Sequence, residues 1–100
     1  MASRLDLQKK LLAIADRVYF QPPETLKLVY PCIVYERQYI RNDHADNSVY
    51  ASATSYSVTV IDPDPDSSIV TAVASLPSCR FDRHFVSENL NHDTFVIYNL

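Results

Sequence analysis

Acidic residues at alternate positions are the first feature of this sequence that could do chemistry. Asp62, Asp64 and Asp66 stand in the segment DPDPDS, with the alternate spacing that calcium-binding loops use. An EF-hand loop also requires a glycine at its sixth position and a glutamate at its twelfth, where this chain has Ser67 and Val73. We therefore interpret the aspartates as turn and helix-capping residues and expect no metal site.

Histidines and acidic residues also gather around one predicted hairpin near the end of the sequence: Asp82, His84, Ser87, His92 and Asp93. Ser87 with a histidine and an aspartate would imitate a catalytic triad. Hydrolases of that kind need a nucleophile on a strained turn and oxyanion donors, and no GxSxG-like turn can form in a chain without glycine. His84 and His92 also lack the short spacing that presents two imidazoles to one metal ion. We expect histidines at strand ends and no catalytic residue.

Composition excludes several further classes of function. Phosphate loops and dinucleotide fingerprints need glycine so that the backbone can approach the ligand, so we expect no nucleotide cofactor. The net charge of -3 provides no basic stripe for nucleic acid. No apolar run has the length of a membrane span, and the first residues, MASRLDLQKK, carry charges where a signal peptide has its apolar core. We expect a soluble protein that is not secreted by that route.

The chain has the size and composition of one globular domain, covering residues 1–100. Hydrophobic residues make up 47% and charged residues 21%, which is too apolar for a disordered chain. Cys32 and Cys79 lie in apolar surroundings without a CxxC motif, and we interpret them as buried free thiols.

The first predicted element is a helix. Its apolar stripe consists of Leu7, Leu11, Ile14 and Val18, and the prolines after Gln21 end it. The segment from residue 24 to 30 alternates in polarity but runs into a proline, so we expect a loop or an edge segment there.

Two strand patterns surround a polar segment in the middle of the chain. The first strand begins at Cys32, and the second runs from Tyr56 to Ile61, with β-branched and aromatic residues at alternate positions. The intervening RNDHADNSVYAS is too polar for a core. We predict a long, projecting β-hairpin with its tip near residues 44–47; a disordered connecting loop is the alternative.

A short helix follows the second of these strands. Asp64 is the predicted N-cap and Pro65 the first helical residue, because that position needs no backbone N–H. Ile69, Val73 and Leu76 form its apolar stripe, and the proline at position 77 ends it.

Two more strands complete the predicted fold. Cys79, Phe81, Arg83 and Phe85 alternate with Arg80, Asp82 and His84, and the last strand alternates from Phe95 to Tyr98. The predicted class is α+β: two layers, with helices packed on a mainly antiparallel four-stranded sheet in the order α-β-β-α-β-β.

Four segments resemble a known group of proteins: YPCIVYER (30–37), ADNSVY (45–50), YSVTVIDPDPDS (56–67) and LPSCRFDRHFVSENLNHDTFVIY (76–98). They are similar to the small neck proteins of long-tailed bacteriophages called tail terminator or tail completion proteins. The resemblance extends over about three quarters of the chain and contains no catalytic motif. It implies a structural virion protein, assembled in the host cytoplasm, whose hexameric ring caps the head-proximal end of the tail tube.

Such a ring would stop tail polymerisation and provide the surface for head-tail joining. The implied partners are other copies of the chain, the tail tube protein and a head-tail connector or stopper protein. DNA would pass the lumen without specific binding, and no membrane is involved. The predicted interface residues lie in the hairpin: Tyr39, Arg41, Asn42, Asp43, His44 and Tyr50. The alternatives are a head-completion or stopper subunit, a small enzyme that uses the histidines, or a monomeric binding module.

Overall fold

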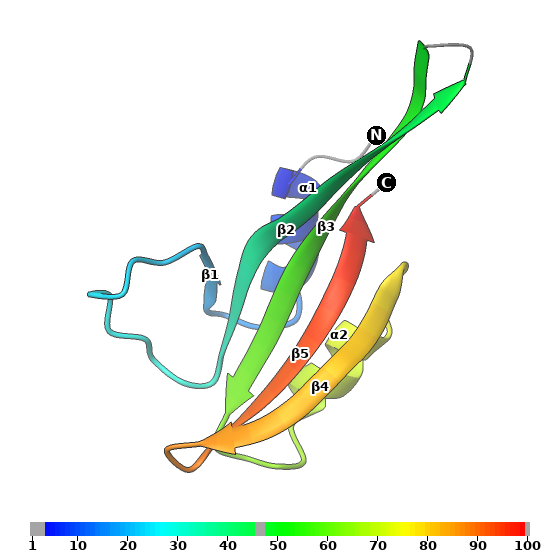
Figure 1. Cartoon of the computed structure of the whole chain (residues 1–100). Helices are drawn as coiled ribbons and strands as arrows, with labels where there is room; N and C mark the ends of the chain where they lie inside the picture. The colour runs from blue at the N-terminus through cyan, green and yellow to red at the C-terminus, as the bar shows by residue number, and fades with distance from the viewer. Residues whose placement is uncertain (1–3, 46–47, 100) are drawn as a thin grey trace.

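The computed structural model of the chain describes residues 4–45 and 48–99 and has the predicted α+β class (Figure 1). The elements are α1 (Arg4–Leu12), β1 (Val18–Phe20), β2 (Cys32–Ala45), β3 (Ser48–Asp62), α2 (Ser68–Ala74), β4 (Cys79–Ser87) and β5 (Leu90–Asn99). The strands form one sheet in the order β1-β2-β3-β5-β4. β1 runs parallel to β2, and the other neighbours pair antiparallel. The described part of the sheet is therefore five-stranded and mixed, which corrects the predicted four-stranded sheet.

The additional strand β1 occupies the end of the predicted first helix. Helix α1 ends at Leu12, and Val18 belongs to β1. The β-branched and aromatic residues Val-Tyr-Phe pair with β2, and backbone bonds flank them on both sides. The N–H of Ile33 donates to the carbonyl of Arg17 at 2.9 Å, and the N–H of Gln21 donates to the carbonyl of Tyr35 at the same distance. Residues 18–20 therefore pair with the edge of β2, although Val18 continues the helical spacing of apolar residues in the sequence.

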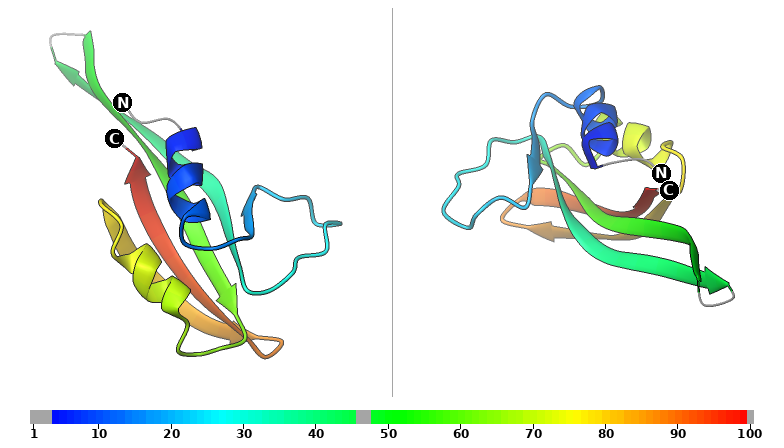
Figure 2. Two further views of the ribbon diagram at one scale, coloured as in Figure 1. Left: turned by 180° about the vertical axis from the view of Figure 1, so that it is seen from behind. Right: turned by 90° about the horizontal axis from the view of Figure 1, so that it is seen from above.

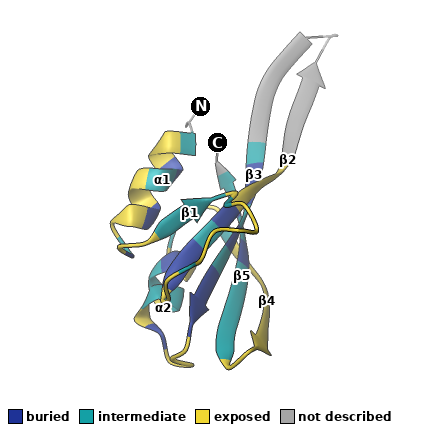
Figure 3. Cartoon of the chain, turned by 90° about the vertical axis from the view of Figure 1, so that its left-hand side faces the viewer, coloured by how far each residue is buried: buried dark blue, intermediate teal, exposed yellow. Residues whose placement is uncertain are grey.

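Both helices pack on the same face of the sheet, so the domain has the two predicted layers (Figure 2). The core lies between the helices and the sheet, and Figure 3 shows its buried residues along β2, β3 and β5. Its members are Leu7, Leu11, Ala15, Ile33, Tyr35, Tyr56, Val58, Val60, Val73, Phe95 and Ile97. Tyr35, Val58, Phe95 and Phe81 are successive neighbours across four strands. This row runs through the middle of the core face.

A polar cluster around Tyr35 ties α1 to the sheet. The Tyr35 hydroxyl donates to the side-chain oxygen of Gln8 and accepts a hydrogen bond from Arg4 at 3.1 Å. The Arg4 guanidinium also lies 4.4 Å from the ring centre of Phe20, whose ring is 4.9 Å from that of Tyr35. The Tyr35 hydroxyl on β2 therefore holds α1 against the sheet, and Arg4 of α1 also contacts Phe20 of β1.

Tyr35→Phe is expected to lower the free energy of unfolding by about 0.5–1.5 kcal/mol, because it removes a partly buried hydrogen-bonded hydroxyl and leaves the ring in place. Urea unfolding followed by circular dichroism measures this cost. In a double-mutant cycle with Gln8→Ala, the two costs should be less than additive, because both changes remove the same bond. Strict additivity would contradict the proposed link.

The acidic corner between β3 and α2 consists of Asp62, Asp64 and Asp66. Aspartate side chains close successive turns there, and none of them caps the helix. Asp62 Oδ1 accepts a hydrogen bond from the N–H of Asp64 at 2.8 Å, and Asp64 Oδ1 accepts one from Asp66 at 2.9 Å. The N-cap of α2 is Ser67, whose hydroxyl accepts from the N–H of Ile69 at 3.2 Å. The prediction of Asp64 as N-cap and Pro65 as first helical residue was therefore wrong. Aspartate side chains that bond two residues ahead favour turns and delay the helix.

Ser67→Ala is expected to cost about 0.5–2 kcal/mol of stability, because it removes the capping acceptor of α2. Asp64→Ala is the matched control: Asp64 is exposed and closes only a turn, so its loss should cost about 0.5 kcal/mol or less. Thermal and urea unfolding of both variants measure the difference. A larger cost for Asp64→Ala would restore the original capping assignment.

The β4–β5 hairpin turns through Glu88 and Asn89, which both have positive φ, 53° and 64°. Ser87 pairs directly with Leu90, so the loop is a two-residue turn of the type that favours Asn-Gly. The double substitution Glu88→Asn and Asn89→Gly should therefore raise the unfolding free energy by about 1 kcal/mol, because Asn and Gly adopt a positive φ at a lower cost. Differential scanning calorimetry measures the change, and the same pair of residues in reverse order serves as control. Equal effects from both orders would contradict the turn geometry.

Candidate interaction surface

The outer halves of β2 and β3 extend beyond the rest of the sheet, as Figure 1 shows. β5 pairs with β3 only from Thr54 to Asp62, and β1 pairs with β2 only from Ile33 to Tyr35. The hairpin pairing between β2 and β3 continues to Ala45 opposite Ser48. In the described sheet, the outer strands therefore pair only with each other. A two-stranded ribbon alone is marginal in water, so this hairpin is suited to a partner.

All six predicted interface residues lie on these two strands. Arg41, Asn42, Asp43 and His44 pair with Ala53, Ser52, Ala51 and Val49, and Tyr39 pairs with Ser55. Tyr50 stands at a register shift. The backbone thus brings the six together in one ribbon. Their side chains lie outside the described part of the structure, so their role as an interface stays a prediction.

Two irregularities interrupt the hairpin register. Arg37 pairs with Tyr56 but Tyr39 pairs with Ser55, so Gln38 is an extra residue of β2. The Gln38 side-chain oxygen accepts a hydrogen bond from the Ser55 hydroxyl at 3.4 Å. Such bulges increase the local twist and re-aim a strand. This one lies near the point where the hairpin leaves the core.

The sheet face opposite the helices, which faces the viewer in Figure 1, forms a second candidate surface. Register places a row of half-buried residues there: Val34, Thr59 and Thr94, with Ser57 and Val96 beside them. The hydroxyls of Thr59 and Thr94 are 3.5 Å apart. The face is mixed in polarity and not covered by either helix. The residues named here are only half-buried, whereas those of the core face are buried.

Every residue of β4 after Cys79 is exposed, because β4 lies at the outer edge of the sheet. Phe81 pairs with Phe95 and Arg83 with Thr94, so Asp82 is an extra residue that forms a bulge. The bulge shifts the alternation by one position. The predicted alternation is therefore interrupted, and Phe81 and Phe85 lie on different sides of the sheet.

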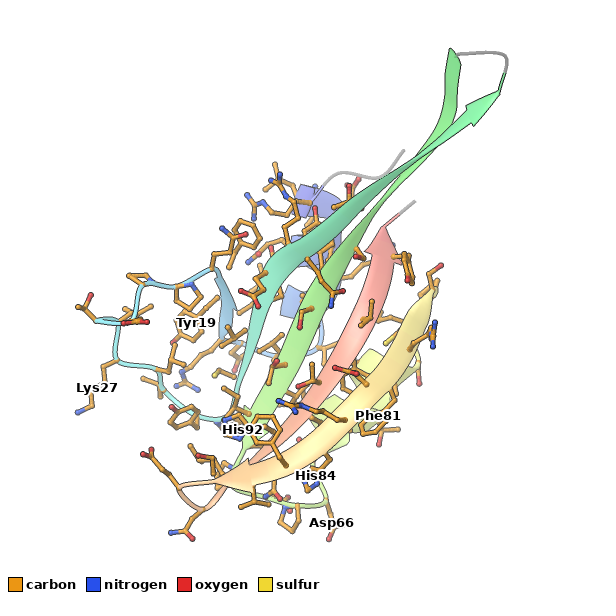
Figure 4. The ribbon with its side chains drawn as sticks, viewed as in Figure 1. Tyr19, Lys27, Asp66, Phe81, His84 and His92 are labelled. Carbon is orange, nitrogen blue, oxygen red and sulfur yellow. The ribbon has the colours of Figure 1, made fainter. Side chains whose placement is uncertain are left out.

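The two phenylalanines of β4 show this division directly. The Phe81 ring meets the core residue Phe95 at 5.6 Å, on the helix side. The Phe85 ring stacks on His92 at 4.6 Å, and the Arg83 guanidinium lies 4.9 Å from the centre of the Phe85 ring. Phe81 remains 58% exposed even though it touches the core. Phe81 and His92 can be located along the β4–β5 hairpin in Figure 4.

The two histidines of this hairpin also lie on opposite faces. His84 pairs with Asp93, while His92, the next residue on β5, pairs with Phe85. His84 Nε2 is 3.3 Å from the Asn91 side-chain oxygen, and His92 Nδ1 is 3.1 Å from the Leu90 carbonyl. The structure therefore does not bring both imidazoles into one site (Figure 4).

Neither the acidic corner nor the cysteines present an arrangement suited to metal chemistry. Among the described residues, no group of three or more His, Cys, Asp or Glu side chains could hold a metal ion. Burial raises the pKa of the Cys32 thiol to about 11, although Arg17 lowers it somewhat, and burial also raises the pKa of Cys79. Both thiols are free, and Cys79 is only half-buried, in contrast to the prediction. At neutral pH both are protonated and poor nucleophiles.

Sequence reasoning did not identify which strands keep a free edge. The outer β3 segment, Ser48–Ala53, has no β5 partner, and the outer edge of β4 has no neighbour in the described sheet. A usable signal was present, because residues 48–61 contain no charged residue and no proline. Natural edge strands normally carry such residues to prevent pairing.

Compared with known proteins, the chain matches no protein-family model and no curated protein. Neither helix in the described part of the chain has the length and apolar character needed to span a membrane.

Proposed function

We propose that the protein is a structural subunit of a ring, hexameric by resemblance, that caps the head-proximal end of a phage tail tube. The ring would terminate tail polymerisation and present the surface for head-tail joining. The observation that carries the proposal is the outer β2–β3 hairpin, whose two strands pair with no other strand of the described sheet. A ribbon of this kind gains stability when it contacts a neighbouring subunit.

The remaining features are compatible with an assembly role. A ring is built from heterologous contacts, in which two different surfaces of the subunit meet, and the hairpin and the β4 edge are two such surfaces. The net charge of -3 suits a lumen through which DNA must slide without being held. The proposed partners are other copies of the chain, the tube protein and the connector or stopper protein.

The direct test is negative-stain electron microscopy of the purified protein, alone and mixed with purified tail tubes that lack their terminator. We expect rings, either in concentrated solution or at one end of the tubes. The matched control is a mixture with tubes that already carry a terminator, to which the protein should not bind. Protein that stays monomeric and leaves open tube ends bare would overturn the proposal. Binding to portal-bearing heads instead would identify the stopper alternative.

A further inference from the structure

The outer β3 segment is an unusual strand edge. Its one described strand neighbour is β2, and the pairing with β5 begins only at Thr54 opposite Asn99. Its sequence, SVYASA, contains no charge and no proline, whereas the paired part of β2 contains Arg41 and Asp43. Uncharged edges of this composition are the ones that accept another strand.

The outer edge of β4 is a further unpaired edge, at the end of the sheet beyond β5 (Figure 1). Val86 is 61%, Phe81 58% and Phe85 37% exposed, so this strand carries three large apolar side chains in contact with water. β4 has 9 residues and is about 30 Å long, and the outer β3 segment is about 20 Å long, at roughly 3.3 Å per residue. The shorter segment can therefore lie along the longer one.

The charges on the two edges decide which pairing is favourable. β4 carries Arg80, Asp82 and Arg83 and has a net positive charge, so two β4 edges paired with each other would bring two net-positive strands together. The outer β3 segment adds no charge and can lie beside β4 without any like-charged pair. Two outer β3 segments could pair with each other, but such a dimer would leave Phe81 and Val86 uncovered.

We propose that the outer β3 segment of one copy adds as a further strand to the β4 edge of a second copy. The contact joins two different surfaces, so each copy keeps a free edge for the next one, and the assembly can close into a ring. The sheet of one subunit would continue through β4 into the hairpin of its neighbour. This inference rests on the proposed ring function and specifies its subunit contact.

Cysteine cross-linking tests the contact. In a Cys79→Ala background, Ala51→Cys is placed on a tagged copy and Val86→Cys on an untagged copy. Cys32 is 0% exposed and stays unreactive. The copies are mixed at a concentration that gives rings, or on tail tubes, and treated with a short bismaleimide. We expect a mixed dimer of position 51 with position 86. The control pairs Ala51→Cys with Leu12→Cys, an exposed position on α1, and should give no product.

The outcomes separate this contact from the proposed function. A product between two Ala51→Cys copies identifies the symmetrical dimer and overturns the inference. Rings that give no 51–86 product also overturn it, and they leave the ring function intact. A 51–86 product in protein that never caps tubes supports the contact and overturns the proposed function. Protein that stays monomeric in concentrated solution and on tubes overturns both.

Discussion

Phe95→Ala is expected to lower the free energy of unfolding by about 3–5 kcal/mol. The Phe95 side chain is 1% exposed and lies in the middle of the core row, between Val58 and Phe81. Its removal leaves a cavity under the helices and ends the edge-to-face contact with Phe81. Domains of this size have a total stability of about 5–15 kcal/mol, so a large part of it would be lost. Urea unfolding followed by circular dichroism measures the cost.

Phe85→Ala is the matched control for this substitution. It makes the same chemical change on the same β4–β5 hairpin, but Phe85 is 37% exposed and stacks on His92 at the face without helices. Its loss should cost about 1 kcal/mol, the size of an aromatic stacking contribution. Similar costs for the two variants would contradict the placement of Phe95 in the core and of Phe85 on the opposite face of the sheet.

The elements that sequence predicted well are those with a long and regular pattern. β-branched and aromatic residues alternate from Tyr56 to Ile61, and this segment lies within β3. The stripe of Ile69, Val73 and Leu76 packs against the core as predicted, with Val73 fully buried. A period sustained over several residues identifies both the element and its buried face.

The features that sequence could not predict depend on single residues or distant partners. β1 has 3 residues, and its stability comes from pairing with β2, which lies later in the chain. The bulge at Asp82 could not be predicted because the segment CRFDRHF follows a regular strand alternation, which gives no sign of an extra residue. The N-cap could not be assigned because Asp64, Asp66 and Ser67 are all capping residue types, and only the turn bonds select Ser67.

The candidate surface was predicted in part for the same reasons. Polarity between two strand patterns predicted the hairpin from Tyr39 to Tyr50, and β2 and β3 form it. Strand order determines which edges stay free, and order depends on contacts between distant segments. The edge of β4 therefore became a candidate only when the sheet order β1-β2-β3-β5-β4 was known.

Removal of the outer hairpin is expected to abolish assembly with little effect on folding. Ile40 pairs directly with Thr54, so residues 41–53 can be replaced by Asn-Gly, a two-residue turn suited to that pair. The core residues and the pairing of β3 with β5 stay in place. The unfolding free energy should therefore change by about 0.5 kcal/mol or less, as expected for changes far from a core. Urea unfolding of the shortened protein measures this, and light scattering measures its loss of assembly.

Phage complementation connects this loss to the proposed function. In the proposed function, a subunit without its hairpin cannot close the ring, so we expect tails of abnormal length or tails that do not join heads. The matched control is His84→Ala combined with His92→Ala, which leaves the hairpin intact and should complement normally. The enzyme alternative predicts the reverse, with the histidine variant inactive and hairpin loss tolerated. Normal tails and normal head joining with the shortened, folded protein would show that the hairpin does not carry the assembly contact.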